Sequence, residues 1–177
     1  MFQRYWYYCW LGMLLITLFS PLCAVSQTSP LLKFSIQDQF DSLHTESDYL
    51  GGITIVIGSD KGGSQYEKIW IQAIRDSLGN KLNGNEIKFL TVANVSSVPF
   101  FLKGLVRSKF PQDKKEWVLL DWKGYFADTY QFVGDATNIM IVDRNGGLVY
   151  KTNGQTLDNQ KLIVICNKIR DVVQSTK

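Results

Sequence analysis

The chain has 177 residues, of which 45% are hydrophobic and 20% are charged, and its formal net charge is +3. Acidic and basic side chains are interspersed along it, which is typical of an ordinary solvated surface. This distribution excludes the clustered basic face of a nucleic-acid-binding protein, so we expect no nucleic-acid partner.

The first 26 residues have the pattern of a signal peptide. Arg4 precedes the apolar run Trp10–Leu22, and Ala24-Val25-Ser26 has the small-x-small form of a cleavage site. We therefore expect export, to a periplasm or out of the cell. Two alternatives stay open: residues 5–25 are long and apolar enough to be retained as a membrane tether, and Cys23 could carry a lipid.

Cleavage before Gln27 leaves residues 27–177, which is the length of a single domain. Cys166 is then the only cysteine, so no internal disulfide can form and stability must come from packing. Cys166 falls on the apolar stripe of the last predicted helix, which favours a place in the core over a reactive role.

The mature chain begins with a predicted hairpin or extended arm, followed by a buried strand. Residues 34–37 and 44–49 flank the turn-forming segment 38–42. The segment Ile53–Gly58 is rich in β-branched residues and apolar on both faces, which is typical of a central parallel strand.

A helix is predicted over Ser64–Leu78, after the glycine-rich loop Ser59–Gly63. Ser64 and Glu67 fit a capping box, and apolar residues recur behind them at helical spacing. Gly79 is a typical helix stop.

The rest of the chain alternates between strands and helices. We expect strands at 87–93, 117–120, 138–142 and 148–151, and helices at about 96–106, 124–132 and 157–173. The Asn145-Gly146 turn predicts that the last two strands form a hairpin. Strand–helix alternation predicts parallel pairing of the earlier strands, and hence an α/β three-layer sandwich with a mixed central sheet and helices on both faces.

This order of elements resembles the thioredoxin superfamily in its redoxin, or peroxiredoxin-like, form. Three local sequences carry the resemblance: Phe34-Ser-Ile-Gln-Asp-Gln-Phe, Asp48-Tyr-Leu-Gly-Gly, and Val142-Asp143-Arg-Asn-Gly-Gly-Leu-Val. Together they cover roughly residues 34–173. The resemblance implies a thioredoxin-like fold whose reactive thiol lies on the loop that opens the first helix, where the helix N-terminus lowers the pKa of a thiol.

The chain departs from the family pattern at that reactive site. The two cysteine positions of the family correspond to Lys61 and Ser64, and a peroxidatic cysteine is also lacking. Ala136 stands where the family has a cis-proline, and we expect a trans peptide bond there. No catalytic residue can be carried over, and we expect neither a cofactor nor a metal, because His44 is the only histidine.

We therefore expect a non-catalytic redoxin-like domain that binds a protein or peptide partner of the cell envelope. The candidate groove consists of two facing loops and one aromatic side chain: Asp60, Lys61, Gly62, Gly63 and Ser64; Asp135, Ala136 and Thr137; and Trp122. Three alternatives remain open: a thiol-dependent oxidoreductase or peroxidase-like enzyme using Cys166, a hydrolase built on Ser64, His44 and Asp60, and a membrane-tethered assembly factor.

Overall fold

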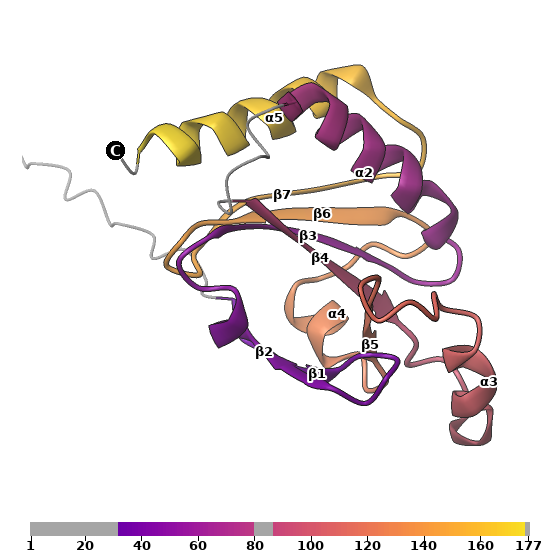
Figure 1. The fold of residues 1–177 in the computed structure, drawn as a ribbon. Helices are drawn as coiled ribbons and strands as arrows, with labels where there is room; N and C mark the ends of the chain where they lie inside the picture. Colours follow the sequence, from indigo (N-terminus) through magenta and orange to yellow (C-terminus); the bar gives the residue numbers. More distant parts are fainter. Residues whose placement is uncertain (1–31, 80–86, 176–177) are drawn as a thin grey trace, which may run out of the picture.

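The computed structural model describes residues 32–79 and 87–175, shown in Figure 1. The described chain begins with a hairpin of β1 (Ser35–Gln37) and β2 (Leu43–Thr45), followed by the short helix η1 (Glu46–Asp48). The elements after it are, in order, β3 (Ile53–Ser59), α2 (Ser64–Leu78), β4 (Ile87–Asn94), η3 (Phe100–Leu102), α3 (Lys103–Arg107), β5 (Leu119–Asp121), α4 (Tyr125–Thr129), β6 (Thr137–Val142), β7 (Leu148–Gly154) and α5 (Asn159–Gln174).

The predicted signal peptide, the possible tether and Cys23 lie outside the described residues. Within the part of the chain that is described, no helix is both long enough and apolar enough to cross a membrane.

Five strands form the main sheet, in the spatial order β5-β4-β3-β6-β7. β3, β4 and β5 run parallel, whereas β6 and β7 are antiparallel to their neighbours, so the predicted mixed sheet is confirmed. β3, β4 and β5 therefore end, and β6 begins, at one shared edge, which we call the C-terminal edge. In open α/β sheets this is the edge where ligands bind.

Layers of structure cover both faces of the sheet, which confirms the predicted three-layer sandwich. Helices α2 and α5 lie on one face, while α4 and the β1–β2 hairpin lie on the other (Figure 1). Successive residues of β3 point to opposite faces, so Ile55 and Ile57 pack with Trp70 of α2, whereas Val56 packs with Phe126 of α4. All seven residues of β3 are buried for this reason.

The hairpin is held in shape by a buried carboxylate. The Oδ1 atom of Asp38 accepts hydrogen bonds from the backbone N–H groups of Phe40 and Ser42, at 2.8 and 3.0 Å, and its Oδ2 lies 2.9 Å from His44 Nε2. The His44 ring also stacks on Trp117, with ring centroids 4.2 Å apart. An isolated antiparallel bridge between Asp38 and Leu119 then joins the end of β1 to β5.

The helix expected at about 96–106 is the prediction that differs most. The structure has only the turn η3 and the five-residue helix α3 there. A residue before proline is disfavoured in the helical region, so Val98 cannot continue a helix into Pro99, whose own ψ of 141° is extended. The apolar residues Phe101 and Leu105 of this segment are exposed.

Candidate functional site

Two loops meet at the C-terminal edge, and the carboxylate of Asp60 joins them. Its Oδ1 accepts a hydrogen bond from the backbone N–H of Gly63 at 2.8 Å, and its Oδ2 accepts one from the N–H of Asp135 at 3.0 Å. The hydroxyl of Thr137 donates to the carbonyl oxygen of Gly63 at 3.1 Å. The structure thus brings together the two predicted loops, residues 60–64 and 135–137.

The contact between these loops is too close to leave an open groove. An added Cβ at Gly62 would lie 1.9 Å from Asp135 Oδ1, and one at Gly63 would lie 2.2 Å from the carbonyl oxygen of Ala136. Gly63, Ala136 and Thr137 are buried, whereas Lys61, Ser64 and Asp135 are exposed. The loops therefore form a packed junction whose surface is offered by only these three exposed side chains.

The predicted capping box at the start of α2 is wrong. Gly63 takes the N-cap position, and the Ser64 hydroxyl donates to the carbonyl oxygen of Lys61 at 2.9 Å. The carboxyl of Glu67 instead accepts a hydrogen bond from the buried hydroxyl of Ser59, at 2.6 Å. The carboxylate that binds a backbone N–H at the start of α2 is therefore that of Asp60, which accepts from Gly63, and not that of Glu67.

Burial of Glu67 behind the loop changes its acidity. Desolvation raises the pKa of this carboxyl to about 7, and the hydrogen bond from Ser59 offsets only part of that effect. Glu67 therefore titrates near neutral pH directly beneath the packed junction.

The structure does not assemble the serine hydrolase arrangement considered from the sequence. His44 is engaged with Asp38 and Trp117 in the hairpin, while the Asp60 carboxylate is engaged with backbone N–H groups. The Ser64 hydroxyl donates to a carbonyl of its own loop.

Cys166 lies in the core, as its position in the predicted helix indicated. Its side chain belongs to the cluster between α2, α5 and the sheet, and the residue is 2% exposed. Burial raises the pKa of the thiol, against smaller lowering effects of a hydrogen bond to Ser77 and of the charge of Arg170. Ser77 lies 13 residues beyond Ser64 on α2, which is about 20 Å along a helix. The thiol is therefore remote from the packed junction.

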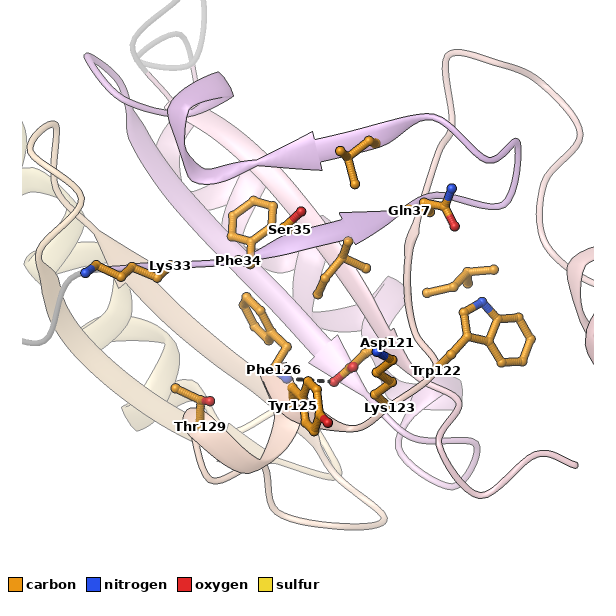
Figure 2. A pocket seen from close by; sticks show the side chains of 13 residues that line it. Lys33, Phe34, Ser35, Gln37, Asp121, Trp122, Lys123, Tyr125, Phe126 and Thr129 are labelled. Carbon is orange, nitrogen blue, oxygen red and sulfur yellow. Dashed lines mark hydrogen bonds between the residues drawn. The ribbon is translucent and has the colours of Figure 1, made fainter. Parts of the chain in front are cut away.

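Trp122 belongs to a different feature, a surface cavity of about 510 Å³ between the hairpin and the start of α4 (Figure 2). We call it the aromatic pocket. Its lining comes from residues 33–37 and Leu43 of the hairpin and from residues 120–123, Tyr125, Phe126 and Thr129. The prediction grouped Trp122 with the two loops because it follows the carboxyl end of a strand; the pocket residues of the hairpin were not predicted.

The aromatic pocket lies where the β1 segment and the segment that follows β5 are no longer paired with each other. β1 meets β5 at the bridge between Asp38 and Leu119, and beyond it the two segments line opposite sides of the cavity. Asp121 holds one side in place, since its buried Oδ2 accepts hydrogen bonds from the N–H groups of Phe126 and Ala127 at 2.9 and 3.0 Å. This carboxylate therefore caps the N-terminus of α4 by accepting hydrogen bonds from its first N–H groups.

The rim of the aromatic pocket is cationic. Lys33 and Lys123 line it and are exposed. The ammonium of Lys103 lies 4.9 Å from the Trp122 ring centroid, a favourable cation–π distance. Trp122 Nε1 is buried and has no hydrogen-bond partner within the described part of the chain. A buried donor left unpaired costs free energy.

The described residues contain no group of three or more His, Cys, Asp or Glu side chains placed to hold an ion.

Solved structures of thioredoxin-fold proteins share this architecture. The exposed lipoprotein thioredoxin Etrx1 of Streptococcus pneumoniae is 18% identical, with a TM-score of 0.54 over 77% of this chain and 99% of that one. The mitochondrial 2-Cys peroxiredoxin of Plasmodium falciparum is 14% identical, with a TM-score of 0.53 over 85% and 97%. StoA of Bacillus subtilis is 16% identical, with a TM-score of 0.51 over 76% and 97%.

No protein-family model matches the chain, and no curated protein sequence matches it. The structural likeness therefore establishes the fold alone, at low sequence identity. The chain has a thioredoxin-like α/β fold with an N-terminal β-hairpin, as the sequence predicted.

The packed junction yields a stability prediction. We expect Gly63→Ala to lower the free energy of unfolding by about 2–3 kcal/mol, because its Cβ would collide with backbone atoms of Ala136. The matched control is Gly104→Ala in α3, which meets no atom within 4 Å and should be neutral or slightly stabilising. Urea denaturation measures both; equal effects of the two variants would contradict the packed junction.

Glu67 yields a pH prediction. Its folded-state pKa of about 7 exceeds the unfolded value of about 4.5, so the folded protein binds the proton more tightly. The stabilisation of the fold by protonated Glu67 is complete below about pH 4.5 and is lost as the pH rises through about 7, by at most about 3.4 kcal/mol. Glu67→Gln should remove this loss. Unfolding free energies at pH 5 and pH 8 test it, and the same pH dependence in both proteins would refute it.

Proposed function

We propose that the chain is an exported, thioredoxin-fold protein of the cell envelope that binds a protein or peptide partner and does not exchange thiols and disulfides. The observation that carries the proposal is the aromatic pocket at the C-terminal edge of the sheet. This site replaces the groove between residues 60–64 and 135–137 as the preferred binding surface, because those loops are packed against each other.

The composition of the aromatic pocket supports binding of a side chain rather than catalysis. Its walls are mainly apolar, and its volume lies in the range of about 300–1,000 Å³ typical of ligand sites. Tryptophan and tyrosine are the residues that most often dominate the affinity of protein interfaces. Trp122 lines the cavity and is therefore placed to contact a bound side chain.

The loop that opens α2 supports the absence of thiol exchange. Lys61 and Ser64 stand where the thioredoxin pattern has sulfur, and the Asp60 carboxylate already accepts from the N–H of Gly63 in this loop. A thiolate needs both sulfur and such donors for its stabilisation. Cys166 is buried, and burial disfavours its thiolate. The likeness to an exposed lipoprotein thioredoxin agrees with an extracytoplasmic location.

The binding proposal predicts the effect of Trp122→Ala. Peptides selected against the full chain from a random display library should bind this variant about tenfold or more weakly, a loss of about 1.4 kcal/mol or more. The matched control is Ile69→Ala, which removes an exposed apolar side chain of α2 on the other face. Affinities come from calorimetry. A loss with Lys61→Glu but none with Trp122→Ala would place the partner on the packed junction and overturn the proposal.

The chemical half of the proposal predicts that the protein does not accelerate the reduction of insulin by dithiothreitol. The wild type and Cys166→Ser should both match the rate of the reductant alone. Turnover by the wild type that disappears in Cys166→Ser would establish the thiol-dependent enzyme instead.

A further inference from the structure

A second surface feature lies beside the aromatic pocket, on η3 and α3. Phe100 and Phe101 are 81% and 82% exposed, and Leu105 on the next turn is 58% exposed. We call these three residues the aromatic tip. Single exposed apolar residues are common, but two adjacent phenylalanines with nearly complete exposure indicate a surface that binds a membrane or another molecule.

The aromatic tip projects from the body of the domain. Figure 1 shows α3 beyond the β5 side of the sheet, away from the helices that cover its faces. Two contacts hold the segment in place: Arg107 Nη1 donates to Asp41 Oδ2 of the hairpin turn at 2.9 Å, and Lys103 Nζ lies between the rings of Phe100 and Trp122, 4.8 and 4.9 Å from their centroids. Because the aromatic tip is convex, it is suited to insert into a membrane surface. The aromatic pocket is concave and is suited to receive a side chain.

The chain segment that carries the aromatic tip has a net positive charge. Residues 98–116 contain five basic residues (Lys103, Arg107, Lys109, Lys114, Lys115) and two acidic residues (Asp113, Glu116), so their net charge is 5 − 2 = +3. The whole chain has a net charge of +3, so all other residues together sum to 3 − 3 = 0. Arg107 is paired with Asp41, but Lys109, Lys114 and Lys115 are exposed to solvent.

We infer that the aromatic tip binds an anionic lipid surface. The phenyl rings would enter the boundary between headgroups and acyl chains, and the lysines would contact lipid phosphates, which is the combination used by interfacial membrane-binding segments. Charge complementarity favours this occupant: Lys103 contacts Phe100, the segment that carries the tip has a net positive charge, and an anionic bilayer can bind both the apolar and the cationic side chains. The inference does not depend on a ligand in the aromatic pocket.

Photo-cross-linking of the full chain tests the inference. The photoreactive residue p-benzoylphenylalanine is introduced at Phe101 or, as a matched control, at Ile163, an exposed apolar position of α5 on the opposite face of the sheet. Each protein is irradiated with phosphatidylcholine vesicles that contain either no anionic lipid or about 30% phosphatidylglycerol. Lipid adducts are quantified by mass spectrometry. We expect about tenfold more adducts from position 101 than from 163 in the anionic vesicles.

Charge supplies a second readout. The yield at position 101 should fall about fivefold or more without phosphatidylglycerol, at high salt, or in the Lys114→Glu, Lys115→Glu background. Lys168→Glu, on the exposed side of α5, should leave it unchanged. Equal yields from positions 101 and 163, or a yield that ignores anionic lipid, would overturn the inference. Adducts of position 101 with a protein instead of lipid in native membranes would also overturn it and assign the tip to a protein interface.

Discussion

The carboxylate of Asp60 is the constraint on which the rest of the C-terminal edge depends. It accepts from backbone N–H groups on two loops that are 75 residues apart in the chain. In a thioredoxin-like fold this is where helix α2 presents its N-terminal N–H groups, which can stabilise a thiolate. Here an internal carboxylate accepts from one N–H at the start of α2, that of the N-cap residue Gly63, and Gly63 allows the facing backbone to approach within contact distance.

Because Asp60 joins the two loops, the cavity at the C-terminal edge lies beside β5 and not between these loops. The β1–β2 hairpin contacts β5 through the bridge between Asp38 and Leu119, and Asp121 binds the start of α4. A cavity lies between the hairpin and the start of α4. Trp122 lines that cavity with one buried nitrogen unpaired among the described residues. The carboxylates of Asp38, Asp60 and Asp121 are thus all engaged in hydrogen bonds within the fold.

The sequence predicted the elements whose signals are local. Helix α2 begins and ends where its apolar spacing and Gly79 indicated, and the Asn145-Gly146 turn does join two antiparallel strands. The helix expected at about 96–106 failed because Pro99 blocked its first turn and its apolar residues lacked a neighbouring face to cover. Periodicity alone cannot tell a core-facing stripe from an exposed one, because burial depends on segments elsewhere in the chain.

The sequence by itself determined the order of strands and helices, the thioredoxin-like fold class, and the lack of sulfur at Lys61 and Ser64. Tertiary structure alone decided that Asp60 seals the two loops, that Trp122 faces the hairpin, and that Phe100 is left in solvent. The physical reason is the range of the interactions. Propensity and periodicity act over a few residues, whereas hydrogen bonds and packing between distant segments depend on how the whole sheet is assembled.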